Sequence, residues 1–143
     1  MKTAVDLLSR RDHCRRELLT KLHQRGFPQT VAVQALNRCE NERWLCETRF
    51  AESYVRIKAG KGYGPSRIRQ ELLMKDVSEL DVEAGFRALC DDEHDWFESA
   101  KNQRIKHFGH MPASESKLRQ KQQRYLFNRG FTSEQIRYAC NDE

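Results

Sequence analysis

The feature that most constrains the fold is a motif that occurs three times in 143 residues. In each copy a leucine stands five residues before a bulky apolar anchor, and a small residue stands eight residues after it. The leucines are Leu22, Leu72 and Leu126, the anchors are Phe27, Val77 and Phe131, and the small residues are Ala35, Gly85 and Ala139. The anchors are 50 and then 54 residues apart, which leaves room for three helices in each copy. Two helices cannot bury their apolar faces alone, so the spacing predicts tandem three-helix units.

The residue before each anchor supports this interpretation. Gly26 and Gly130 are the left-handed residues that commonly end a helix. Asp76 stands in the same place in the second copy. Aspartate tolerates the left-handed conformation better than most residues, so we expect a helix to end there too.

The expected architecture is all-α, an elongated and curved array of helices at right angles. Three repeats are predicted, at residues 1–41, 42–93 and 94–143. Capping signals place helix starts at Asp12 or at Cys14 with Glu17, and at Pro28, Pro65, Ser78 with Asp81, and Thr132 with Gln135. The predicted helices are 3–10, 12–24, 28–40, 48–59, 65–75, 78–90, 96–108, 116–128 and from 132 onward. Apolar residues expected on their inner faces include Val5, Val31, Ile57, Cys90 and Leu118.

Charge is unevenly distributed along the chain. Only 38% of the residues are hydrophobic, 33% are charged and the net charge is +5, which predicts a thin core and an acidic partner. Residues 76–98 hold nine acids against Arg87, whereas residues 101–129 hold eight cations against Glu115. The acidic block is either a solvated face or a surface that meets basic groups on a partner or on this chain.

The middle of the chain holds the most distinctive stretch, Lys61-Gly62-Tyr63-Gly64-Pro65-Ser66-Arg67-Ile68-Arg69-Gln70-Glu71-Leu72. Its glycines predict a loop and its proline the first turn of a helix. Ile68 and Leu72 are four apart and share one buried face, so Arg67 and Arg69 are expected to point to solvent or to a partner. Residues 56–70 contain five cations and no acid.

This stretch, preceded by Arg49-Phe50-Ala51, resembles the core signature of the RecX family of bacterial recombinase regulators. The resemblance extends over nearly the whole chain and is strongest in its middle third. It implies a cytoplasmic, all-helical protein of tandem three-helix repeats. It further implies a protein that binds the RecA recombinase and restrains its filament on DNA.

Other classes of function find little support in the sequence. The five cysteines show no C-x-x-C spacing and are expected to be free, buried thiols. His107 and His110 form H-x-x-H without an acid at metal-binding spacing. No nucleotide loop, nucleophile elbow or zinc-protease motif is present. We therefore expect no enzyme activity, no metal or other cofactor, and no membrane segment.

The class of function that remains is binding to a macromolecule, and two hypotheses are open. The chain is either a monomeric regulator that docks on the RecA filament, with weak single- or double-stranded DNA binding as a secondary property, or a small basic nucleic-acid-binding helical module. Composition slightly favours the second hypothesis, and the resemblance favours the first. The residues predicted to contact RecA or DNA are Arg56, Lys58, Lys61, Tyr63, Arg67, Arg69, Lys117, Lys121 and Arg124.

Overall fold

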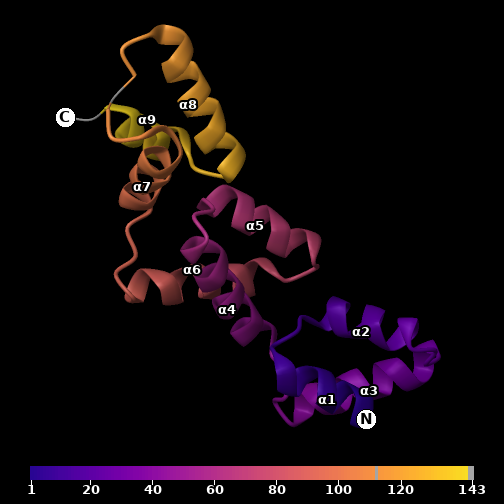
Figure 1. Ribbon diagram of the computed structural model, residues 1–143. Helices are drawn as coiled ribbons and strands as arrows, with labels where there is room; N and C mark the ends of the chain where they lie inside the picture. Colours follow the sequence, from indigo (N-terminus) through magenta and orange to yellow (C-terminus); the bar gives the residue numbers. More distant parts are fainter. Residues whose placement is uncertain (112, 142–143) are drawn as a thin grey trace. The chain divides into compact units, whose positions relative to one another are not determined.

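The computed structural model describes residues 1–111 and 113–141. These residues form nine α-helices and no strand (Figure 1). The helices are α1 (Lys2–Arg10), α2 (Arg15–Gln24), α3 (Gln29–Asn41), α4 (Glu47–Gly60), α5 (Pro65–Met74), α6 (Glu79–Asp91), α7 (Trp96–Phe108), α8 (Ser116–Arg129) and α9 (Ser133–Asn141). The all-α class with tandem helices is confirmed, and each predicted helix is present with shifts of a few residues at its ends. None of the helices in the described part of the chain is long and apolar enough to cross a membrane.

The threefold motif is a repeated helix ending. In each copy the anchor N–H donates to the carbonyl of the leucine five residues earlier, which is the hydrogen bond of a Schellman motif. These bonds join Phe27 to Leu22 at 3.1 Å, Val77 to Leu72 at 3.2 Å and Phe131 to Leu126 at 3.2 Å. The residue before each anchor is left-handed, with φ of 89° at Gly26, 62° at Asp76 and 102° at Gly130. The expected cap at Asp76 is confirmed.

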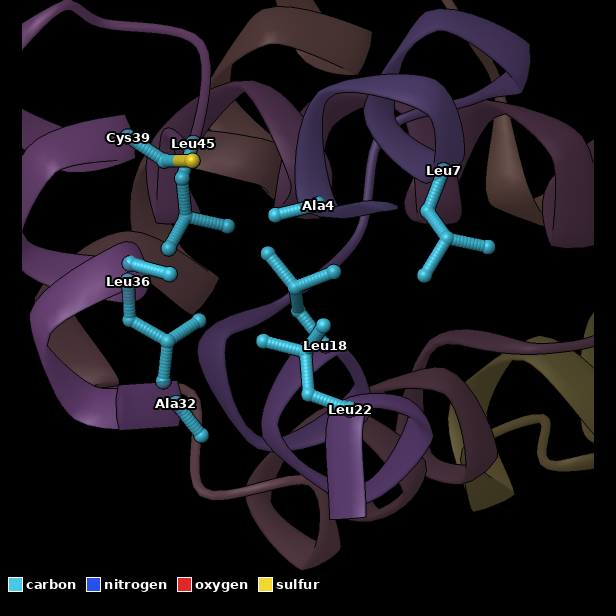
Figure 2. Packing of buried hydrophobic residues seen from close by; sticks show 9 residues of the cluster. Ala4, Leu7, Leu18, Leu22, Ala32, Leu36, Cys39 and Leu45 are labelled. Atoms are coloured by element: carbon cyan, nitrogen blue, oxygen red, sulfur yellow. The ribbon is translucent and has the colours of Figure 1, made fainter. Parts of the chain in front are cut away.

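The chain divides into two compact units, and the first comprises Met1–Tyr54 and Leu72–Arg87. One of its core clusters lies among α1, α2, α3 and the turn that follows α3 (Figure 2). The buried members are Ala4, Leu7, Leu18, Leu22, Ala32, Ala35, Leu36, Cys39 and Leu45. The start of α2 is closed by the predicted capping box between Cys14 and Glu17.

The second unit comprises Val55–Glu71 and Ala88–Glu143. Its core cluster lies among α7, α8 and α9 and contains Ala100, Leu126, Phe131, Ile136 and Ala139. Arg104 is 1% exposed beside this cluster. Its Nε donates to the Ala139 carbonyl at 2.6 Å, so a buried cation stabilises the last turn of α9.

Five apolar positions are not buried as predicted. Ile57 is 56% exposed, and Val5, Val31, Leu118 and Cys90 are also exposed. In α1, α3 and α4 alanines occupy the buried faces instead: Ala4, Ala32 and Ala51. Small side chains let helices approach closely. A Cβ on Gly85 of α6 would lie only 3.0 Å from the Ala51 carbonyl. The cysteines are free, as expected, but only Cys14 and Cys39 are buried.

Candidate functional site

The glycine-rich loop begins with a fourth Schellman ending, at the end of α4. Gly62 is left-handed, with φ of 87°, and the Tyr63 N–H donates to the Lys58 carbonyl at 3.1 Å. The first glycine of the signature is therefore required by its backbone conformation. A Cβ at Gly62 would also displace the side-chain amide of Gln103, which lies against this glycine.

The second glycine of the signature allows the loop to contact the turn between α8 and α9. The Gly64 N–H donates to the Arg129 carbonyl at 2.8 Å, and the Ser66 N–H donates to the Gly130 carbonyl at 2.9 Å. A Cβ on Gly64 would overlap the backbone of Gly130, and a Cβ on Gly130 would overlap Cβ of Arg67. The two segments thus touch backbone to backbone, which only glycine permits.

Arg129 stabilises this contact between the loop and the end of α8. The sequence-based prediction of the site did not include Arg129. Its Nη2 donates to the Lys61 carbonyl at 2.6 Å, and its Nε donates to the Gly62 carbonyl at 3.3 Å. Its guanidinium carbon also lies 4.0 Å from the centre of the Tyr63 ring. In the sequence Arg129 was one of many cations in a basic block, and nothing local distinguished it.

Tyr63 is the centre of the basic site. Besides Arg129, its ring contacts Arg67 at 4.4 Å and Lys58 at 5.2 Å, measured from the guanidinium carbon and from Nζ to the ring centre. A ring face attracts cations, so one aromatic side chain holds three positive groups close together. We call Lys58, Tyr63, Arg67 and Arg129 the Tyr63 cluster.

Arg67 is less free than the sequence analysis expected. Its Nη1 donates to the Asn128 carbonyl at 3.3 Å, near the end of α8, and its Nε pairs with Glu71 at 3.3 Å. The side chain remains 43% exposed. Arg67 therefore helps to bind the loop to α8 and still presents part of its charge to solvent.

The other predicted residues near the loop differ in their surroundings. Arg56 pairs with Asp92 at 3.1 Å, and both side chains are more than half exposed. Asp92 belongs to the acidic block of residues 76–98, so part of that block forms an ion pair with a cation of this chain. Lys61 is exposed and Arg69 is half-buried.

Lys117, Lys121 and Arg124 are exposed on one face of α8. They share this helix with Arg129 but not its face. Five residues separate Arg124 from Arg129, and a helix turns by about 500° over that distance, which leaves them about 140° apart. The predicted site therefore consists of the Tyr63 cluster with its neighbours and a separate basic face on α8.

The described residues contain no group of three His, Cys, Asp or Glu side chains that could hold a metal ion. His107, one of the two histidines of H-x-x-H, stacks on Tyr125 with the ring centres 4.1 Å apart and the planes inclined by 11°. The chemistry available around Tyr63 is thus the binding of anions by guanidinium and ammonium groups.

Three successive segments of the chain match the three domains of one protein family. Residues 1–39 match the first three-helix domain of RecX, residues 47–85 the second and residues 93–140 the third. The chain belongs to the RecX family. The segment that matches the second domain includes Arg49-Phe50-Ala51 and the loop that carries Tyr63, and the segment that matches the third includes α8 with Arg129.

RecX relatives resemble the chain over nearly its full length. A protein of Vibrio vulnificus named "Regulatory protein RecX" is 45% identical over 141 residues, which cover 99% of this chain and 90% of the relative. A protein of the same name from Pseudomonas putida (strain GB-1) is 39% identical over 135 residues, covering 94% and 85%.

Solved RecX structures show the same fold. A crystal structure of regulatory protein RecX matches with a TM-score of 0.79 and 25% identity, covering 99% of this chain and 71% of that one. The crystal structure of RecX from Lactobacillus salivarius matches with a TM-score of 0.78 and 20% identity, covering 99% and 92%.

Proposed function

We propose that this RecX-family chain binds the RecA recombinase and its filament on single-stranded DNA. By doing so it lowers the recombinase's ATP hydrolysis, strand exchange and co-protease activity. The observation that carries the proposal is membership of the RecX family across all three helical domains. The relatives' name, regulatory protein, supports a role without catalysis. We expect the chain to act as a monomer in the cytoplasm, without a cofactor.

The Tyr63 cluster supplies a physical basis for binding. Its cations are held by a ring and by backbone carbonyls, so little side-chain entropy remains to be lost when a partner binds. The guanidinium of Arg67 is partly exposed, and Lys61 stands exposed beside it. Such a preorganised basic surface suits carboxylates on a protein filament or phosphates on DNA.

A direct role in nucleic-acid binding is the second candidate, and α8 favours it. The sequence of this helix, SKLRQKQQRYLFNR, contains five cations and no acid. Lys117, Lys121 and Arg124 line one of its exposed faces, where they can follow a phosphate backbone.

The first candidate is tested by capturing the host's RecA with the immobilised chain, with and without single-stranded DNA and a non-hydrolysable ATP analogue. We expect capture of RecA, strongest for the assembled filament. DNA-dependent ATP hydrolysis by RecA should fall when the chain is added at less than one copy per RecA subunit. Unchanged hydrolysis with the chain in excess, together with no capture, would refute the proposed function.

A further inference from the structure

An aromatic side chain that the proposed site does not use stands exposed at the C-terminal half of α8. Phe127 is 70% exposed, although a phenylalanine gains free energy by being buried. It lines a hollow of about 480 Å³ together with other residues of α8 and α9. These two helices pack together (Figure 1). An exposed aromatic face is the element on which single-strand-binding proteins stack a base, and Phe127 supplies one.

The other lining residues show what this hollow would accept. Arg124 and Arg137 place a cation on each of the two helices, and none of the lining residues is acidic. Gln120, Gln123 and Ser133 add uncharged polar groups. Each glutamine amide offers both donors and an acceptor, so it can bond to the mixed donor and acceptor edge of a nucleobase.

We propose that this hollow is a binding subsite for one unpaired base of single-stranded nucleic acid. The ring of Phe127 stacks on the base, the glutamine amides meet its edge, and Arg124 and Arg137 meet the phosphates on either side. An aromatic platform flanked by cations is the usual construction of sequence-tolerant single-strand binding. A base inside a duplex has both faces already stacked, so double-stranded DNA of the same sequence cannot use Phe127.

An acidic peptide is the competing occupant, and the lining residues favour it less. Carboxylates would pair with Arg124 and Arg137, and backbone amides could bond to the glutamines. An aliphatic anchor side chain, however, offers no flat face to stack on Phe127 and no polar edge for the glutamines. The inference rests on the proposed function in one respect: a chain that binds the filament meets single-stranded DNA as well as the recombinase, and we assign this surface to the DNA. It extends the role of α8 from attraction of phosphates to contact with bases.

The test uses the full chain and a short labelled oligo(dT) containing one 2-aminopurine, without recombinase. Phe127→Ala should weaken binding by at least about fivefold, the lower end for loss of one stacked base. It should also abolish the change in 2-aminopurine fluorescence and leave the salt dependence unchanged. Arg124→Gln with Arg137→Gln should reduce the slope of log affinity against log salt, by about 1.4 for two phosphate contacts on a single strand.

Two matched controls separate stacking from folding. Phe127→Tyr keeps an aromatic face and should bind like the wild type. An abasic strand of the same length should bind to the wild type as weakly as the normal strand binds to Phe127→Ala.

Equal affinity of the wild type for normal and abasic strands would overturn the inference, whatever the variants do. It would also be overturned if Phe127→Ala weakened capture of RecA without DNA and left oligonucleotide affinity unchanged, because the hollow would then belong to a protein partner. Neither result bears on whether the wild type captures RecA, so the proposed function is judged separately.

Discussion

The guanidinium carbon of Arg129 lies 4.0 Å from the centre of the Tyr63 ring while the same side chain donates to the carbonyls of Lys61 and Gly62. One residue at the end of α8 therefore holds both the backbone and the aromatic side chain of the signature loop. We expect the conformation of this loop to depend on Arg129.

The first prediction is that Arg129→Ala loosens the loop. It removes two charge-assisted hydrogen bonds and a cation–π contact, and we expect a loss of about 2 kcal/mol in the free energy of unfolding. Amide hydrogen exchange at Tyr63 and Gly64 should accelerate more than exchange in α1–α3. Arg129→Lys keeps the charge but cannot form the fork of donors, so it should recover only part of the protection. Unchanged exchange at both amides would show that Arg129 does not fasten the loop.

The second prediction compares two glycines near the loop. Gly64→Ala places a Cβ in the backbone of Gly130 and should destabilise the protein by about 1–3 kcal/mol or more. Gly60→Ala meets nothing within 4 Å and lies at the end of a helix. It should be neutral or stabilise by less than about 1 kcal/mol. Thermal or urea unfolding measures both, and equal effects of the two substitutions would contradict the close approach at Gly64.

The third prediction concerns two lysines beside Tyr63: Lys58, which is half-buried, and Lys61, which is exposed. Lys58→Glu with Lys61→Glu should weaken filament binding, because repulsion replaces attraction at an acidic surface. Lys2→Glu with Arg25→Glu changes the net charge equally at exposed positions of the first unit and should weaken binding much less. Filament affinity at several salt concentrations and helicity by circular dichroism are the measurements. Equal losses for the two pairs would mean that net charge alone matters.

Arg67→Glu with Arg69→Glu is a poorer test than the sequence suggests. Arg67 donates a hydrogen bond to the Asn128 carbonyl and makes a cation–π contact with the ring of Tyr63, so its reversal disturbs the loop as well as the surface. We expect this pair to lose stability in addition to affinity, whereas the sequence analysis treated both arginines as mostly solvent-facing. An unfolding free energy equal to that of the wild type would contradict this expectation.

The fourth prediction concerns pH. His13 is buried, its Nδ1 lies 3.0 Å from the Arg11 carbonyl and its Nε2 lies 2.8 Å from Nζ of Lys21. Burial, with the charges of Arg11 and Lys21, lowers the pKa of His13 below its ordinary value of 6.5. The fold therefore favours neutral His13. Its contribution to stability is complete above pH 6.5 and is lost as pH falls toward the lowered pKa.

Unfolding free energies of the wild type and His13→Gln at several pH values between 7 and 5 test this. The variant should be less stable than the wild type at pH 7, and the gap should narrow on acidification. His23→Gln changes an exposed histidine of α2 and should reproduce the wild-type pH dependence. A gap between the wild type and His13→Gln that stays constant with pH would contradict the prediction.

Local patterns in the sequence determined the helices and their ends. Glycine, proline and capping residues act within a few positions of themselves, so the Schellman endings at Phe27, Val77 and Phe131 and the cap at Asp76 could be predicted without tertiary contacts. The signature around Tyr63 likewise sufficed for the family resemblance that the comparisons confirmed.

Only the tertiary structure decided which helix faces are buried and which cations form a site. The sequence favoured the bulky Val5, Val31 and Ile57, but close packing selected faces that carry alanine. Arg129 and Tyr63 meet because two glycines let the backbones of distant segments touch, and no local pattern encodes that approach. The role of a cation depends on which segments pack against it. Arg129 and Lys61 look alike in the sequence, but Arg129 hydrogen-bonds to the backbone of the loop whereas the side chain of Lys61 is exposed.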